Sequence, residues 1–194
     1  MTSEHDPARR AVMAALASLP LISLAGQPSD GEVKKVGSRA LVAYFSRSGN
    51  TRVVAGLIHR TLGTDVFEIQ PARPYPEDYL ATVEQARQER DSGYEPALAA
   101  TVPNLARYDT VYLGFPIWGE TAPPVIRAFL SAHDLTGKTL VPLVTHGGYG
   151  LGNSVSILAS HAPKARLGKG FVMQADQERQ TMERVNAWLK QRTE

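Results

Sequence analysis

Residues 40–62 read ALVAYFSRSGNTRVVAGLIHRTL, and this stretch indicates the fold class. Its first six residues, 40–45, form an unbroken apolar run, which is typical of a strand covered on both faces in a parallel sheet. Over residues 51–62 apolar side chains recur every three or four positions, which predicts a helix, and Gly63 is placed to end it. A buried strand followed at once by a helix predicts the first half of a βαβ unit.

The remainder of the chain repeats this alternation of short apolar runs and helical patterns. Further strands are expected at residues 65–69, 110–115, 139–145 and 170–173. Further helices are expected at residues 78–90, 123–131, 153–161 and 176–190. Strands that alternate with helices predict an α/β fold with a doubly wound parallel sheet. Ligands bind such sheets beyond the carboxyl ends of the strands, so the loops after the first, third and fourth strands form the candidate site.

The composition limits the chemistry that the chain can perform. Its 194 residues suit one domain with a hydrophobic core. The chain contains no Cys, which excludes disulfide scaffolds, thiolate metal sites and Cys nucleophiles. Its 21 Lys and Arg residues and 19 Asp and Glu residues are scattered, so we expect no nucleic-acid partner. His59, His133 and His161 have no partner at metal-ligand spacing, and no metal site is expected.

The first 25 residues differ in composition from the rest. Arg9 and Arg10 precede residues 11–25, which carry no charge and are too few to span a bilayer. Paired arginines, a short apolar stretch and small residues near its end predict an export signal of the twin-arginine type at residues 1–25. The protein would then be periplasmic or otherwise exported, with no stable membrane span after signal removal. The alternative is an apolar helix that packs on the domain or tethers it to a membrane, in a protein that is cytoplasmic or membrane-tethered. Residues 26–38 are predicted to be a polar linker, and residues 39–194 the folded domain.

The loop after the first strand carries six residues suited to an anion: Ser46, Arg47, Ser48, Gly49, Asn50 and Thr51. It lacks the Lys-Ser/Thr ending of a Walker loop and the glycines of a dinucleotide fingerprint. Its hydroxyl and amide groups, together with backbone N–H groups at the start of a helix, can bind a phosphate through hydrogen bonds and the helix dipole. The alternative is an ordinary strand-to-helix turn with a Ser or Thr cap.

Four separate motifs resemble one known family. Residues 45–55, FSRSGNTRVVA, resemble the FMN-phosphate signature of flavodoxins. Residues 74–79 (PYPEDY), 114–119 (GFPIWG) and 145–154 (THGGYGLGNS) are similar to short bacterial flavodoxin-like proteins with a THGG loop. The resemblance runs in order over residues 39–173. It implies non-covalently bound FMN and a flavodoxin-like five-stranded parallel sheet of order 2-1-3-4-5 with helices on both faces, as in flavodoxin itself.

The resemblance also assigns two further loops to the flavin. After the third strand, Pro116, Ile117, Trp118 and Gly119 can offer backbone groups to its polar edge, and Trp118 either covers a flavin face or belongs to the core. After the fourth strand come Thr145, His146, Gly147, Gly148, Tyr149 and Gly150, whose glycines either let the backbone approach a planar ligand or permit a flexible turn. His146 is the candidate catalytic residue, as a proton donor or acceptor near the flavin or a quinone; its alternative role is a hydrogen bond that orders the loop. Tyr75, Tyr79 and Tyr149 are candidates for the second flavin face, although the first two could instead hold the long loop in place.

These implications leave several functional classes open. The first is a redox protein of flavodoxin type that transfers electrons to a partner protein. The second is an FMN-dependent oxidoreductase of the NAD(P)H/quinone type, with a small-molecule acceptor such as a quinone. A binding module without redox chemistry is the third. Ordinary flavodoxins are strongly acidic, whereas this chain has a formal net charge of +2, which favours a higher flavin potential and a weaker attraction to basic partners.

Overall fold

The computed structural model describes residues 38–174, 185 and 187–191. Within these residues, no helix is long and apolar enough to cross a membrane. The predicted export signal at residues 1–25 lies outside the described residues, as do nearly all of the predicted linker and much of the predicted last helix, and all of them stay predictions. Residues 185 and 187–190 of that last helix are helical.

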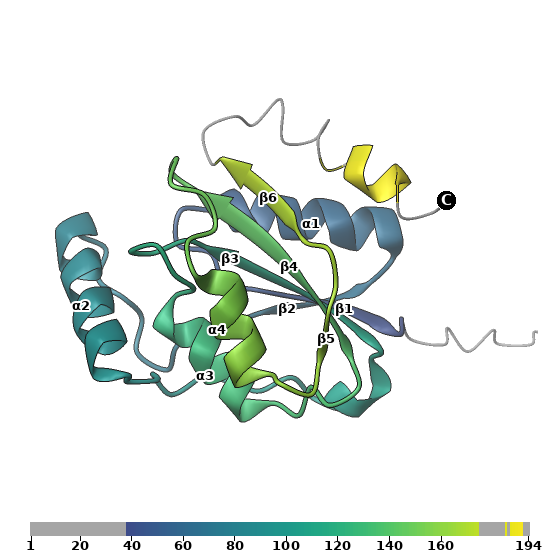
Figure 1. Cartoon of the computed structure of the whole chain (residues 1–194), viewed down its shortest axis with the longest axis horizontal. Coiled ribbons are helices and arrows are strands. Elements are labelled where there is room, and N and C mark those ends of the chain that lie inside the picture. The colour runs from purple at the N-terminus through teal and green to yellow at the C-terminus, as the bar shows by residue number, and fades with distance from the viewer. Residues whose placement is uncertain (1–37, 175–184, 186, 192–194) are drawn as a thin grey trace, which may run out of the picture. The chain divides into compact units, whose positions relative to one another are not determined.

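The described chain folds around one parallel β-sheet (Figure 1). Its strands are β1 (Ala40–Tyr44), β2 (Asp65–Glu68), β3 (Thr110–Pro116), β4 (Thr139–His146), β5 (Arg166–Leu167) and β6 (Phe171–Gln174). They follow the order β2-β1-β3-β4-β5, and β6 also pairs with β4. Every pairing between these strands is parallel. The predicted α/β class and the order 2-1-3-4-5 are confirmed.

The edge beyond β4 differs from the single strand predicted at residues 170–173. β5 pairs with the first half of β4 and β6 with the second half. Between β5 and β6, the three residues 168–170 lie opposite only two residues of β4, so the edge of the sheet bulges there. Pro142 of β4 lies at this bulge, and a side chain at Gly170 would collide with its carbonyl oxygen and ring. The prediction missed β5 because that strand is only two residues long and exposed.

In the described part of the chain, the connecting helices are α1 (Asn50–Leu62), α2 (Tyr79–Ser92), α3 (Pro124–Ala132) and α4 (Ser154–His161), with a 3-10 turn at Leu105–Arg107. The predicted helices lie at these positions, with small shifts at their ends. α1 packs on one face of the sheet, and α3 and α4 pack on the other (Figure 1). α2 lies beside α3, outside these two layers (Figure 1).

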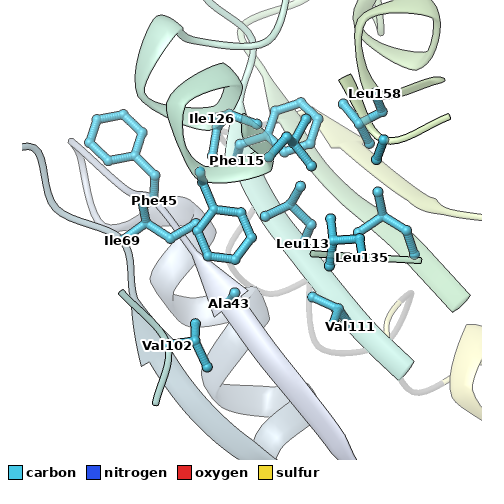
Figure 2. Packing of buried hydrophobic residues seen from close by; sticks show 14 of the residues in the cluster. Ala43, Phe45, Ile69, Val102, Val111, Leu113, Phe115, Ile126, Leu135 and Leu158 are labelled. Atoms are coloured by element: carbon cyan, nitrogen blue, oxygen red, sulfur yellow. The ribbon is translucent and has the colours of Figure 1, made fainter. Parts of the chain in front are cut away.

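Alternate strand residues supply the two hydrophobic clusters that hold the layers together. In β1, Leu41 and Ala43 belong to the cluster under α3 and α4, whereas Val42 belongs to the cluster under α1. Figure 2 shows the first cluster, with Ile126 of α3 and Leu158 of α4 over the strands. Each fully buried side chain of the size of Ile126 or Leu158 stabilises the fold by about 1.5–3 kcal/mol. Burial on both faces is what the apolar run at residues 40–45 predicts.

Gly114 sets how closely α1 approaches the sheet. It lies in β3, where an added Cβ atom would meet Tyr44 Cβ at 2.9 Å and Thr51 Cγ2 at 3.1 Å. A larger residue would push the start of α1 away from the sheet. Because the strands are parallel, the loops that follow β1, β3 and β4 all emerge at one edge, and Gly114 keeps the first of them close to the others.

Candidate functional site

A cavity of about 580 Å³ lies at the carboxyl ends of β1, β3 and β4. This volume is in the ordinary range for small-molecule and cofactor sites, about 300–1,000 Å³. The strand ends and the segments after them line it with Arg47, Ser48, Asn50, Pro116, Ile117, Trp118, Gly119, Glu120, Thr121, Pro124, Thr145, His146, Gly147 and Tyr149. The other wall is α2, which contributes Tyr79, Thr82, Val83, Ala86, Arg87 and Arg90.

The start of α1 forms part of the cavity wall. Gly49 precedes the helix with φ of 95°, and its N–H donates to Ser46 Oγ at 3.1 Å. Among the described residues none caps α1 through its side chain, and the first turn of this helix holds no acidic residue. Its first N–H groups therefore keep the partial positive charge of a helix N-terminus. Ser48 and Asn50 line the cavity at this point, so the start of α1 can bind an anion.

Thr145 joins the three strand-end segments. Its Oγ1 lies 2.9 Å from Oγ1 of the buried Thr51, and either hydroxyl can be the donor. Its carbonyl oxygen accepts a hydrogen bond from the Ile117 N–H at 2.8 Å. Thr145 lines the cavity, whereas Thr51 lies behind the lining. The role of Thr51 in this structure is thus to fix the start of α1 against the end of β4.

The turn at residues 118–121 adopts a left-handed conformation. Gly119 and Glu120 have φ of 56° and 64°, and Trp118 and Thr121 exchange two backbone hydrogen bonds of 3.0 and 3.3 Å. Positive φ at both central residues is characteristic of a type I′ turn and is unusual for glutamate. The Glu120 carbonyl oxygen accepts from the Asn153 N–H at 3.0 Å, which ties this turn to the loop before α4.

Trp118 contacts both the hydrophobic core and the cavity, the two positions that the sequence left open for it. Its ring packs edge-on against Phe45, with centroids 5.2 Å apart, and against Tyr75, with centroids 4.9 Å apart. Phe45 belongs to the buried core. Trp118 itself is half-buried and lines the cavity. The core therefore holds its indole at the cavity wall.

Tyr75 is anchored by a buried carboxylate on α2. Its hydroxyl donates to Glu89 Oε2 at 2.8 Å, and Gln85 Nε2 donates to the other carboxylate oxygen at 2.8 Å. Glu89 is 8% exposed. Burial and the bond to Glu89 raise the pKa of Tyr75 far above its ordinary value, so this tyrosine stays protonated. The pair links α2 to the aromatic group at Trp118.

His146 lies at the end of β4 and orders the loop that follows. Its Nδ1 accepts hydrogen bonds from the Gly148 N–H at 3.1 Å and from the Gly150 N–H at 3.2 Å. A neutral imidazole that accepts at Nδ1 carries its proton on Nε2. The loop-ordering hydrogen bond is therefore present, and His146 also lines the cavity.

α2 is tied to the strand-end loops at both of its ends. At the first end, Arg47 Nη2 donates to the Glu77 carbonyl oxygen at 2.6 Å, and the guanidinium lies 5.8 Å from the Tyr79 ring centroid. At the other end, Arg90 Nη1 donates to the Gly119 carbonyl oxygen at 3.3 Å. The cavity is the space that α2 and these loops enclose between the two contacts.

The structure brings most of the sequence-predicted residues to one place. The lining does not include Ser46, Gly49, Thr51, Gly148 or Gly150, which shape the loops through the contacts given above. Glu120, expected near the flavin ring edge, also lines the cavity, whereas sequence reasoning missed Thr121, Pro124 and all of the α2 wall except Tyr79. The spacing of the α2 residues marks one helix face, but that pattern alone does not distinguish a cavity wall from a core. Within residues 38–174, 185 and 187–191, no three His, Asp or Glu side chains gather as a metal site would need.

The chain is similar to flavodoxins and flavoproteins in sequence and structure. A family model for flavodoxin matches residues 39–192. No curated protein matches the chain. Among solved structures, a proposed flavoprotein of Bacteroides uniformis is 35% identical, with a TM-score of 0.70, and the match covers 79% of this chain and 99% of that one. A proposed flavoprotein of Bacteroides eggerthii is 34% identical, with a TM-score of 0.68, and the match covers 78% and 95% of the two chains.

A flavoprotein of Lactobacillus acidophilus, solved in complex with FMN, is similar in fold. It is 20% identical, the match covers 74% of this chain and 97% of that one, and the TM-score is 0.61. At that identity the likeness supports the fold alone.

Proposed function

The chain belongs to the flavodoxin family, and on this premise we propose that it binds FMN non-covalently in the strand-end cavity and transfers electrons through the flavin. The observation that carries the proposal is the combination of an uncapped helix N-terminus and an aromatic wall in one cavity. A phosphate and a planar ring system need these two environments. FMN, when bound, supplies reversible one- and two-electron chemistry, and the protein supplies binding and tuning.

The first loop and α1 would hold the phosphate. Ser48 offers a hydroxyl and Asn50 an amide, beside the free N–H groups of the first helical turn. Arg47 adds a cation that meets only a backbone carbonyl and the Tyr79 ring in its described contacts. These groups fit a dianionic phosphate, since they supply both hydrogen bonds and positive potential.

The segments after β3 and β4 would hold the ring system. Trp118 is fixed edge-on against Phe45 and Tyr75, so its position in the cavity is preset. The Thr121 hydroxyl is buried and has no partner among the described residues, which suits a polar ligand group. His146, with its Nδ1 engaged by two N–H groups, can donate from Nε2 to an oxygen or nitrogen acceptor in the cavity.

Replacing the phosphate-loop hydroxyl tests this assignment. Ser48 is exposed, so Ser48→Ala should leave the free energy of unfolding of the FMN-free protein unchanged within about 0.5 kcal/mol. The same change removes a hydrogen bond to a charged group and should weaken FMN binding about tenfold or more. Fluorescence titration of FMN measures the affinity. The matched control is Ser156→Ala on α4, which is also an exposed serine and lies outside the cavity lining. An equal FMN affinity in the Ser48 and Ser156 variants would contradict the assignment.

The α2 wall favours a second candidate function, an FMN-dependent oxidoreductase with a small-molecule acceptor such as a quinone. A pure electron shuttle needs no cavity beyond the flavin, whereas an enzyme needs room for a substrate. An anaerobic redox titration of the FMN-loaded protein separates the two. Two well-separated one-electron steps, the second at very low potential, support the carrier, and a single two-electron step with quinone turnover supports the enzyme.

A further inference from the structure

α2 presents one continuous stripe to the cavity, and two of its members, Thr82 and Ala86, are buried. The lining residues Tyr79, Thr82, Val83, Ala86, Arg87 and Arg90 recur every three or four positions. This spacing keeps them on one face over the length of the helix. The flavodoxin resemblance assigns only the first of them, Tyr79, to a ligand. The stripe is therefore a wall whose ligand remains to be identified.

The stripe has two chemically different ends. Its first half is apolar and aromatic, with Tyr79, Val83 and Ala86, and its second half carries Arg87 and Arg90. Arg47 meets α2 at Tyr79, whereas Arg90 meets Gly119 at the other end. At 1.5 Å per residue, Tyr79 and Arg90 are about 16 Å apart along the helix. One phosphate at the start of α1 would thus be held at the Arg47 end, which leaves the arginine pair to another anionic group.

The acidic partners of this arginine pair leave it available to a ligand. Arg87 pairs with Glu84 and Asp91, and Arg90 pairs with Asp91, all as solvent-exposed or partly exposed ion pairs. Such pairs exchange partners readily, because each charge is also well solvated. The cavity lining contains three arginines, Arg47, Arg87 and Arg90. Among the described residues, Glu120 is its one carboxylate. The lining residues thus carry an excess of positive charge, which the adjacent Glu84 and Asp91 offset in part.

We propose that the α2 wall binds a planar aromatic electron acceptor that carries an anionic group, of the class of sulfonated or carboxylated quinones. The ring lies along the apolar half of the stripe, and the anionic group lies at Arg87 and Arg90. This inference rests on the proposed FMN site, which supplies the electrons. Reduction of a quinone to its hydroquinone takes two electrons and two protons. An anionic two-electron-reduced flavin would supply both electrons and one proton, and solvent would supply the second proton.

Equilibrium binding to the oxidised, FMN-loaded protein tests the proposal without turnover. The probes are anthraquinone-2-sulfonate and the uncharged 2-(hydroxymethyl)anthraquinone, measured by equilibrium dialysis. We expect the sulfonate to bind at least tenfold more tightly. The double variant Arg87→Gln/Arg90→Gln should abolish this difference. Arg87→Gln alone, which keeps the Arg90 contact to Gly119, should remove part of it. Arg60→Gln on α1, an exposed arginine outside the lining, is the matched control and should behave as wild type.

The outcomes separate the two proposals. FMN occupancy is read from flavin absorbance before either probe is added, so a protein that takes up no FMN overturns the proposed function itself. If FMN binds but the two probes bind equally, or neither binds, the acceptor site is overturned. It is also overturned if the arginine variants weaken FMN binding as much as sulfonate binding, because these arginines would then serve the cofactor.

Discussion

At the scale of single residues, contacts between backbones set the shape of the cavity. Gly152 has φ of 52°, and a Cβ atom there would overlap the Glu120 carbonyl group. That carbonyl is the group that accepts from Asn153 and joins the turn after β3 to the loop before α4. A side chain at position 152 would force these two segments apart, which only glycine avoids.

Gly152→Ala should therefore destabilise the fold and the site together. We expect a loss of about 2–4 kcal/mol in the free energy of unfolding, from backbone strain plus the steric overlap, and weaker FMN binding. Gly137→Ala is the matched control, since Gly137 has φ of 73° but open space around the added Cβ. The control should lose only about 1 kcal/mol from left-handed strain and keep its FMN affinity. Urea unfolding and FMN titration of both variants measure this, and equal losses in the two would contradict the account.

The residue scale is also where sequence reasoning reached its limit. The order Ser-Arg-Ser-Gly-Asn-Thr correctly predicted a strand-to-helix loop at one wall of the cavity. It could not predict that Thr51 pairs with Thr145, because that contact depends on how the start of α1 lies against the end of β4, and the two residues are 94 positions apart in the chain. His146 shows the same limit, since both of its alternative roles need a loop conformation that the residue types alone do not define.

At the scale of elements, a buried histidine links α3 to the loop before β3. His133 follows α3, and its Nε2 accepts from the Val102 N–H at 2.9 Å, while Nδ1–H donates to the Phe129 carbonyl oxygen at 2.7 Å. Burial lowers the pKa of His133, although the bond to Phe129 acts in the opposite direction. Protonation of Nε2 would remove the acceptor that Val102 needs.

This arrangement predicts a loss of stability in mild acid. A lowered folded pKa means that the unfolded chain binds the proton more tightly, so the stabilisation is complete above the ordinary histidine value of 6.5 and is lost as the pH falls through the lowered pKa. We expect the free energy of unfolding to decrease from pH 7 to pH 5 in the wild type and to change less in His133→Gln. Urea midpoints across this range measure the effect. A parallel decrease in both proteins would show that His133 is not its source.

Element positions could be predicted well where periodicity reflects burial on two faces. The apolar runs of β1, β3 and β4 identified the central strands because a parallel sheet buries both of their faces. The bulged edge was missed because it depends on Pro142 and Gly170 meeting across two strands. α2 was predicted as a helix, but its role as a cavity wall was not, since a stripe at helical spacing looks the same over a core and over a ligand.

At the scale of the whole molecule, the family of the chain and its net charge both bear on its function. The fold and the family model place the chain among the flavodoxins. Its formal net charge of +2 and the arginines in the cavity lining differ from the acidic character of ordinary flavodoxins. A positive environment stabilises an anionic reduced cofactor and an anionic substrate alike, which is consistent with an enzyme that reduces a small acceptor.

Paired titrations of the purified protein with FMN and with riboflavin show whether the strand-end cavity binds the flavin through its phosphate. The two ligands share the ring system and differ only in the phosphate, so their ratio of affinities isolates the contribution of the loop at the start of α1. We expect one FMN per chain and riboflavin binding at least about tenfold weaker, since each hydrogen bond to a charged group contributes about 1.5–3 kcal/mol. A correctly folded protein that binds neither flavin, or binds the two equally, would contradict this expectation.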